Sequence, residues 1–340
     1  MYELLNNWIS PWIDHSYGFY LFFLFLCIVF GFYLLIKGGD WLSDHSAKIA
    51  YQLGVPPVVV GLTIVSIATS TPELFTSISA LRSDSPGLIL GNIIGSNIAN
   101  IALILGIALL IGSIPTQGAV SRPQQICLIS VSLFFCLILS FSSNQEIGLI
   151  SGAVLLVFLV LYLSILTISA IRNKHASRSS EQISPEDEHS GPISISMFML
   201  LFSTLALWAG ADSLVYGSKS LAQIGGVPEE LIGFTLLAIG TSLPELAASV
   251  SLVRKGQTSM LLGNIIGSNL FNISLIGGLA GILGPVTAGS PNPWVDYLFL
   301  MITTLLLVFW LRGKNLAKRE GIILLLIYAG ASTSTWILNS

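Results

Sequence analysis

The stretch GNIIGSNIANI at residues 91–101 recurs as GNIIGSNLFNI at residues 263–273, with nine of the eleven positions identical. A second matching pair lies upstream of these two: GLTIVSIATSTPE at residues 61–73 corresponds to GFTLLAIGTSLPE at residues 233–245. Both pairs are separated by the same 172 positions. Because self-similarity at a fixed period is the signature of an internal repeat, the chain is predicted to consist of two related halves.

The composition places this chain in a membrane. Of its 340 residues 53% are hydrophobic and 9% are charged, and the mean hydropathy is +0.84. Soluble domains carry about 25% charged residues, so the composition excludes a soluble enzyme, a nucleic-acid-binding protein and a disordered chain. We therefore expect an integral membrane protein, neither an enzyme nor a nucleic-acid partner, whose backbone polar groups are satisfied within helices in the lipid bilayer.

The apolar runs predict about ten transmembrane helices, each near the ~20 residues that a bilayer requires. The expected ranges are 19–37, 56–81, 87–112, 124–142, 147–171, 195–217, 228–252, 259–284, 294–312 and 320–337. Five helices fall in each half, and because five is odd, the second half enters the membrane in the opposite sense. The predicted fold is an all-α integral membrane protein with two inverted-topology repeats, an architecture in which secondary transporters place their site near the midplane.

Lys and Arg are distributed unevenly over the expected joints. If the N-terminus lies outside the cytoplasm, twelve of the fourteen cations fall on cytoplasmic joints, and only Arg82 and Lys219 fall on outer ones. Cytoplasmic loops are enriched in Lys and Arg, so both termini are predicted on the non-cytoplasmic side. We expect a first half at residues 1–171, a polar cytoplasmic linker at 172–194 and a second half at 195–340.

Two acidic residues lie well inside the apolar spans, at equivalent positions of the repeats. They are Glu73 and Glu245, and no Lys or Arg lies at comparable depth in the same spans. A carboxylate at that depth costs several kcal/mol unless it is paired, protonated or bound to a cation. The pair is therefore predicted to bind a cation; the alternative is a pair of protonated glutamic acids that hold helices together.

Hydroxyl groups share a helix face with each carboxylate. Thr69 and Ser70 precede Glu73 by four and three residues, and Thr241 and Ser242 precede Glu245 likewise. Pro72 and Pro244 are expected to kink or break their helices and to release carbonyl oxygens. Carboxylate, hydroxyl and carbonyl oxygens together suit hard cations such as Ca²⁺ or Na⁺.

The GNIIGSN stretches carry a polar helix face with a period of four residues. Its members are Asn92, Ser96 and Asn100 in the first half and Asn264, Ser268 and Asn272 in the second. For Asn92 and Asn264 interhelical hydrogen bonding is favoured, whereas the sequence leaves the roles of Asn97 and Asn269 open. The glycine pairs Gly91 and Gly95, and Gly263 and Gly267, predict close helix packing, and Asp40 and Asp212 are expected to cap or anchor span ends.

The doubled pattern T-S-x-P-E … G-N-I-I-G-S-N resembles the two α-repeats of the cation/Ca²⁺ antiporter superfamily, most closely its prokaryotic Na⁺/Ca²⁺ exchanger branch. The resemblance covers residues 38–112 and 210–284. It implies antiport of Ca²⁺ against Na⁺ by alternating access, with no cofactor, because the ions themselves are the cargo. It also implies a plasma (inner) membrane location and a moving pair of helices at residues 19–37 and 195–217.

The resemblance further implies a set of ion ligands. These are Glu73, Glu245, Asn100, Asn272, Thr69, Ser70, Thr241, Ser242, Ser96 and Ser268, joined by main-chain carbonyls near Ser66 and Ala238. Some exchangers carry Asp at the position of Asn272, so the cluster implied for this chain has two carboxylates and two amides. That arrangement also occurs in H⁺-coupled relatives, which leaves H⁺ as an alternative coupling ion.

Two other functions remain open at this point: exchange of Ca²⁺ or another divalent cation against H⁺, and, from a different class, a cation channel. A pore would more naturally show a ring of sites from identical subunits. The expected partners are inorganic cations and lipid, with no obligate protein partner.

Overall fold

The computed structural model describes residues 17–82, 86–142, 146–172, 192–225, 240–287, 293–313 and 315–339. Outside this part of the chain lie Pro228, Ala238 and most of the predicted linker.

Helices dominate the described chain, and eight of them are long and apolar enough to cross a membrane. The segments of the first half are α2 (Tyr17–Leu53), α3 (Pro57–Val60), η1 (Gly61–Val65), α4 (Ser66–Arg82), α5 (Pro86–Ile98), η2 (Ala99–Ile104), α6 (Leu105–Ile111), α7 (Arg122–Phe141) and α8 (Leu149–Arg172). Those of the second half are α9 (Ile193–Ile224), α12 (Leu243–Arg254), α13 (Thr258–Phe271), η5 (Asn272–Ile276), α14 (Gly277–Leu283), α15 (Pro293–Trp310) and α16 (Lys318–Asn339). Each of the ten predicted spans contains one of these helical segments, so the predicted fold class is confirmed.

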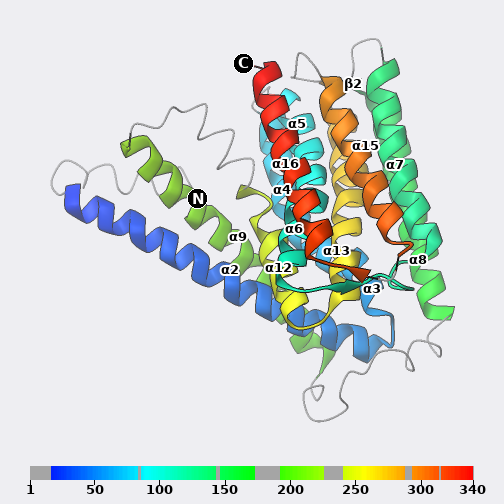
Figure 1. Ribbon diagram of the computed structural model, residues 1–340, viewed down its shortest axis with the longest axis horizontal. Helices are drawn as coiled ribbons and strands as arrows, with labels where there is room; N and C mark the ends of the chain where they lie inside the picture. Colours follow the sequence, from blue (N-terminus) through cyan, green and yellow to red (C-terminus); the bar gives the residue numbers. More distant parts are fainter. Residues whose placement is uncertain are drawn as a thin grey trace.

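Two short β-ribbons connect the halves at opposite ends of the bundle. β1 (Ile114–Pro115) pairs antiparallel with β4 (Asn315–Leu316), and β2 (Glu146–Ile147) pairs antiparallel with β3 (Val286–Thr287). Figure 1 shows β2 at the upper end of the upright helices. Since β1 and β3 occupy equivalent positions of the repeat, the two ribbons are counterparts in the inverted halves.

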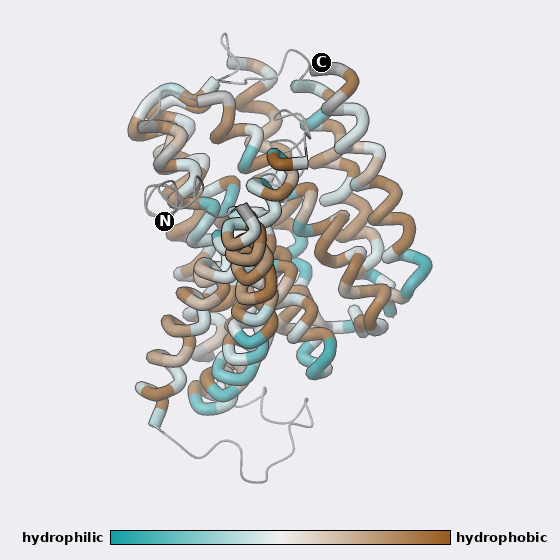
Figure 2. The backbone as a smooth tube through the Cα atoms, turned by 90° about the vertical axis from the view of Figure 1, so that its left-hand side faces the viewer, coloured by the Kyte–Doolittle hydropathy of each residue, from teal (hydrophilic) through white to brown (hydrophobic). Residues whose placement is uncertain are grey.

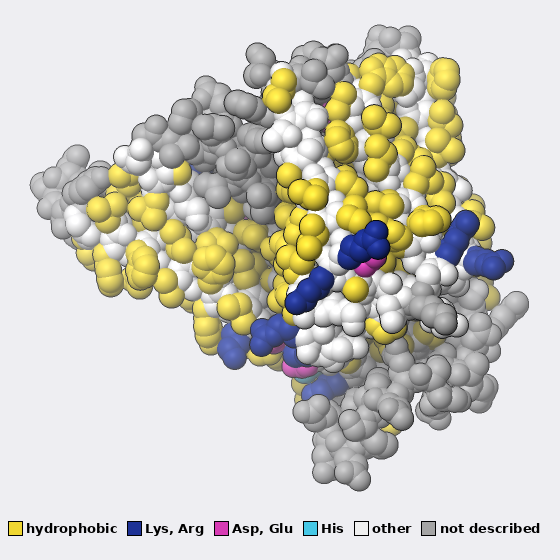
Figure 3. Space-filling model, viewed as in Figure 1, with side chains coloured by type: hydrophobic (Ala, Val, Ile, Leu, Met, Phe, Trp, Pro, Cys, Tyr) yellow, Lys and Arg dark blue, Asp and Glu magenta, His cyan; other side chains and the backbone are white. Residues whose placement is uncertain are grey.

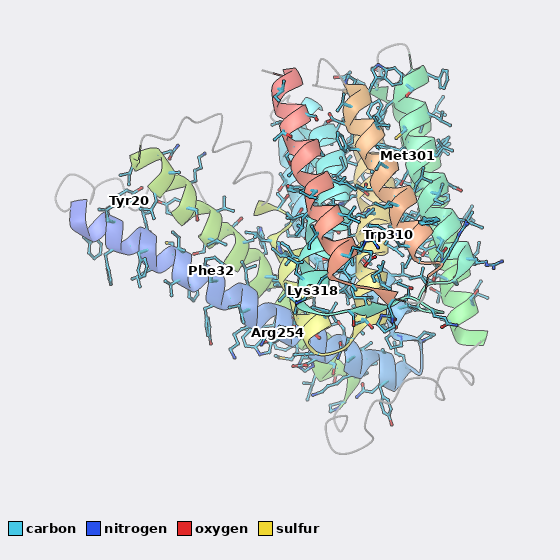
Figure 4. All side chains as sticks on the ribbon, viewed as in Figure 1. Tyr20, Phe32, Arg254, Met301, Trp310 and Lys318 are labelled. Atoms are coloured by element: carbon cyan, nitrogen blue, oxygen red, sulfur yellow. The ribbon has the colours of Figure 1, made fainter. Side chains whose placement is uncertain are left out.

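Helices α2 and α9 run side by side and slant away from the upright bundle (Figure 1). Glycines bring them together: a Cβ at Gly31 would lie 2.7 Å from the backbone nitrogen of Leu214, and one at Gly210 would lie 3.0 Å from the Gly31 carbonyl oxygen. The Ser213 hydroxyl also donates to the Cys27 carbonyl oxygen at 2.9 Å. Tyr20 and Phe32 lie on the projecting part of α2 (Figure 4), and Phe32 is 53% exposed, as suits a surface facing lipid.

The GNIIGSN helices form the centre of the bundle. In the 18-residue apolar segments of the two spans that contain these helices, 78% and 83% of the residues are buried, whereas the corresponding share for α2 is 22%. A Cβ at Gly61 would collide with the Met260 carbonyl oxygen, and one at Gly263 with that of Val58. The predicted close packing is thus confirmed at Gly263, and at Gly267 as well, where a Cβ would collide with Ser66 Oγ.

The equivalent glycines of the first half show no such contact among the described residues. A Cβ at Gly91 or Gly95 would meet no atom within 4 Å. By the repeat, the segment that corresponds to the contact surface of Gly263 and Gly267 is residues 230–238, which lie outside the described chain.

Two expectations about helix ends need correction. α2 does not end near residue 37 but continues to Leu53, because residues 38–53 pack on α12: a Cβ at Gly39 would lie 2.7 Å from the Ala247 carbonyl oxygen, and Leu42 and Ile49 are fully buried. Asp40 and Asp212 consequently lie within α2 and α9 and do not cap them.

Candidate ion-binding site

The two acidic residues lie at the centre of the site. Glu73 is in the middle of α4, Glu245 is in the first turn of α12, and each is only 1% exposed. Their carboxyl groups are close enough to interact directly. Neither oxygen of Glu73 has a hydrogen-bond partner among the described residues, and neither does Oε2 of Glu245. Two acidic groups thus share one buried region, and no cationic side chain in the described part of the chain acts on either of them.

The two prolines act differently on their helices. Pro72 lies inside α4, which continues through it, so of the two predicted effects, a kink or a break, the break does not occur at this position. Membrane helices tolerate such prolines because neighbouring groups satisfy the freed carbonyl. Thr241 and Ser242 form a turn, α12 begins directly after it at Leu243, and Pro244 lies in the first turn of this helix. Glu245 therefore lies at a helix N-terminus, where unpaired N–H groups favour negative charge.

The Thr-Ser pairs reach across to the opposite repeat. Ser70 Oγ donates to Glu245 Oε1 at 3.1 Å, and Thr69 Oγ1 donates to Asn264 Oδ1 at 3.3 Å. The equivalent Thr241 Oγ1 lies 3.5 Å from Asn92 Oδ1. Each half therefore supplies hydroxyl groups to the other, which brings Glu73 and Glu245 into one site.

The asparagines favoured for helix pairing do bridge helices. Asn92 Nδ2 donates to the Glu73 carbonyl oxygen at 3.3 Å and to Ser77 Oγ at 3.1 Å. Asn264 Oδ1 accepts from Thr69 Oγ1 at 3.3 Å, and Ser66 Oγ lies 3.4 Å from the same oxygen and 3.0 Å from the Asn264 main-chain oxygen. The predicted interhelical bonds of Asn92 and Asn264 are thus confirmed, and the same bonds hold Ser66 against α13.

Asn100 and Asn272 lie in π-helical turns, which the sequence analysis missed. Asn100 is the second residue of η2, and Asn272 is the first of η5. Both are buried, and Asn100 Oδ1 and both amide atoms of Asn272 have no partner among the described residues. Single π-helical turns inside α-helices often mark functional sites. The only signal in the sequence was that the two asparagines in these turns lie at equivalent positions of the repeat.

The remaining predicted ligands lie in the same buried region. Ser96 Oγ lies 3.4 Å from Asn92 Oδ1, whereas the hydroxyl groups of Ser242 and Ser268 have no hydrogen-bond partner among the described residues. The main chain of Ser66 is buried at the junction of η1 and α4. Ala238 lies outside the described part of the chain.

Unpartnered oxygens define what the site can bind. Seven buried side-chain oxygens of the predicted ligands have no partner in the described structure: both of Glu73, Oε2 of Glu245, Oδ1 of Asn100 and of Asn272, and the hydroxyls of Ser242 and Ser268. Buried polar atoms are ordinarily hydrogen-bonded. Among the described residues no group of three or more His, Cys, Asp or Glu side chains is arranged so that it could hold a metal ion. Two carboxylates surrounded by neutral oxygens suit a hard cation and not a transition metal.

Comparison with known proteins agrees with this chemistry. The family model described as sodium/calcium exchanger protein matches residues 23–168 and 195–336. This chain belongs to the sodium/calcium exchanger family. A relative, the sodium/calcium exchanger MaX1 of Methanosarcina acetivorans, is 33% identical over 89% of this chain and 96% of its own length.

Two further matches extend the family assignment. The uncharacterized membrane protein MJ0091 of Methanocaldococcus jannaschii is 33% identical over 89% of this chain and 95% of its own length. A solved structure of the sodium-calcium exchanger NCX_Mj, soaked with Na⁺ and Sr²⁺, superposes with a TM-score of 0.77 at 29% identity and covers 92% of this chain and 98% of that one. As a member of the exchanger family, the chain is a multi-pass membrane antiporter and not an enzyme.

Proposed function

We propose that this protein exchanges Ca²⁺ for Na⁺ across the membrane by alternating access at a midplane site built on Glu73 and Glu245. The observation that carries the proposal is a pair of interacting, buried carboxyl groups, one from each inverted repeat, with no cationic side chain of the described residues acting on either of them. Relatives whose names specify sodium/calcium exchange, MaX1 and NCX_Mj, support the choice of ions.

The charge of the site enforces exchange. One Ca²⁺ neutralises both carboxylates, and two Na⁺ or two protons do the same. An empty site leaves two charges buried, at a cost of several kcal/mol each. That cost disfavours the passage of an empty carrier between its two states, so the inward movement of one ion is coupled to the outward movement of the other.

The neutral oxygens divide between the ions. Asn100 and Asn272, with Ser96 and Ser268, complete the coordination of Ca²⁺, which takes six to eight oxygen ligands. The hydroxyl pairs Thr69 and Ser70, and Thr241 and Ser242, serve Na⁺. Ser70 already donates to Glu245 at 3.1 Å, and its oxygen turns to the ion when Na⁺ binds.

The pair of helices α2 and α9 moves past the bundle in this proposal. The glycine-lined contact between α2 and α9 keeps the two helices together as one body, and this pair slants away from the upright helices (Figure 1). The GNIIGSN helices, the most buried of the molecule, remain still and hold the site.

The membrane orientation is proposed from the cations. Arg254 and Lys318 lie at the lower end of the bundle (Figure 4), and Lys and Arg side chains form a band across the lower part of the face in Figure 3. The longest hydrophilic stretch of the tube in Figure 2 also lies at its lower end. This end faces the cytoplasm, both termini lie on the other side, and the membrane is the plasma (inner) membrane.

The first experiment is Ca²⁺ uptake into proteoliposomes loaded with Na⁺ at matched pH, repeated with a pH gradient and no Na⁺. Uptake driven by the Na⁺ gradient is the expected result. Uptake driven only by protons would assign the protein to H⁺-coupled exchange, with Glu73 and Glu245 as the groups that exchange the protons. Flux that collapses the Ca²⁺ gradient without any counter-ion would indicate a channel.

A further inference from the structure

Asn97 and Asn269 precede the candidate ligands Asn100 and Asn272 by three residues and are completely buried. Neither belongs to the proposed ligand set. Asn269, from α13, nevertheless contacts the opposite repeat twice: its Nδ2 donates to the Asn97 main-chain oxygen at 3.3 Å, and its Oδ1 accepts from Asn100 Nδ2 at 3.0 Å.

These two bonds fix which end of the Asn100 amide faces the site. A main-chain carbonyl can only accept a hydrogen bond, so Asn269 must direct its NH₂ group to Asn97 and its oxygen to Asn100. Asn100 must then present its own NH₂ group to Asn269. Its Oδ1, the atom that can coordinate a cation, has no partner among the described residues and is left for the ion.

We propose that Asn269 is a positioning residue for Ca²⁺ binding, which holds the Asn100 amide with its oxygen directed to the ion. The inference rests on the proposed function. Partners that orient a metal ligand typically change metal affinity 10–100-fold when they are removed. Without Asn269, the amide of Asn100 is free to rotate and to direct an NH₂ group at the cation.

The repeat does not provide the same support on the other side. Asn97 Nδ2 donates to the Ile93 carbonyl oxygen of its own helix at 2.7 Å. Its Oδ1 has no partner in the described chain, and neither amide atom of Asn272 has one. Asn97 therefore holds no ligand, although it has the same residue type, burial and repeat position as Asn269. It is the matched control.

The test measures Na⁺-driven Ca²⁺ uptake in proteoliposomes and derives the KM for Ca²⁺ and kcat. We expect Asn269→Leu, which preserves side-chain size, to raise the KM for Ca²⁺ roughly tenfold and to change kcat less. The control Asn97→Leu is expected to leave the KM within about twofold of the unmutated value, because the Asn97 amide bonds to its own helix and orients no ligand. If the leucine variant does not fold, Asn269→Ala removes the same amide without adding bulk.

A double-mutant cycle separates positioning from packing. If Asn269 acts through Asn100, then Asn269→Leu adds little to the KM of Asn100→Ala, because residues that act together are not additive. Additive effects, or equal effects of Asn269→Leu and Asn97→Leu, would overturn the inference while Ca²⁺ exchange itself stands. An unchanged KM in Asn100→Ala would overturn it as well. No Na⁺-driven uptake by the unmutated protein would overturn the proposed function and this inference with it.

Discussion

At the scale of single residues, the two glutamates differ in how the chain holds them. Glu245 lies at the N-terminus of α12 and accepts a hydrogen bond from Ser70, whereas Glu73 lies inside α4 and both its carboxylate oxygens lack a partner among the described residues. In the proposed site Glu73 therefore depends more on a bound cation than Glu245 does. Its neutralisation is the most direct probe of the site.

Glu73→Gln is expected to abolish Na⁺-driven Ca²⁺ uptake while the protein still folds. It removes a buried charge, so the variant without ions should melt at a higher temperature than the unmutated protein, and the rise in Tm that Ca²⁺ causes should disappear. Glu320→Gln is the control, because Glu320 caps the start of α16 through a 2.9 Å bond from the Ala317 nitrogen, far along the chain from the site residues. Unchanged uptake in Glu73→Gln would remove this residue from the site.

At the scale of elements, the contact between α2 and α12 distinguishes the two ends of the molecule. Ser251 Oγ donates to Asp40 Oδ1 at 2.7 Å, and Lys255 Nζ reaches Asp44 Oδ1 at 2.6 Å and the Asp40 main-chain oxygen at 2.9 Å. The repeat places Ser83 and Tyr216 at the positions equivalent to Lys255 and Asp44. Ser and Tyr side chains cannot form an ion pair, so the pair between Lys255 and Asp44 has no counterpart at these two equivalent positions.

Removal of this ion pair is expected to favour separation of α2 from α12. The side chains of Lys255 and Asp44 are 29% and 49% exposed, so the pair contributes at most about 1 kcal/mol, a roughly fivefold change in an equilibrium. The measurement is the labelling rate of a cysteine at Ser43, which is 1% exposed at this contact and donates to Gln257 Oε1 at 3.1 Å. Lys255→Met should accelerate labelling up to about fivefold.

The control for this measurement is Lys37→Met in the same Ser43→Cys background, because Lys37 also lies on α2 and precedes the contact. An equal labelling rate in the Lys255→Met and Lys37→Met proteins would mean that the ion pair does not hold the two helices together.

At the scale of the whole molecule, the inverted repeat makes the orientation testable. The proposed topology puts twelve of the fourteen cations on the cytoplasmic side, and in this topology a fluorescent protein inserted after Ser180 should fluoresce in the cytoplasm. An alkaline phosphatase fused after Ser340 should be active outside it. The controls exchange the two reporters: alkaline phosphatase inserted after Ser180 should be inactive, and the fluorescent protein fused after Ser340 should not fluoresce. The opposite pattern would reverse the proposed topology and with it the side on which Lys255 lies.

Linear patterns determined the class of the protein, its helical membrane fold, the inverted repeat and the two buried carboxylates. Each of these features depends on hydropathy or on self-similarity along the chain. A Glu inside a long apolar run can be recognised from the sequence, whichever helices its own helix packs against. The interhelical roles of Asn92 and Asn264 were also predictable, because a polar face in lipid must pair with another helix.

Tertiary structure decided the features that depend on which helices meet. The polar residues 38–53 are typical of a joint, yet α2 continues through them because this segment packs on α12 at Gly39 and buries Leu42 and Ile49. The sequence likewise treats Asn97 and Asn269 alike, and only the packing of α13 on the first half lets Asn269 hold Asn100 while Asn97 bonds to its own helix. Equivalent positions in a repeat predict equivalent places in the fold, but hydrogen bonds between helices depend on distances of a few tenths of an ångström, which only the packed molecule determines.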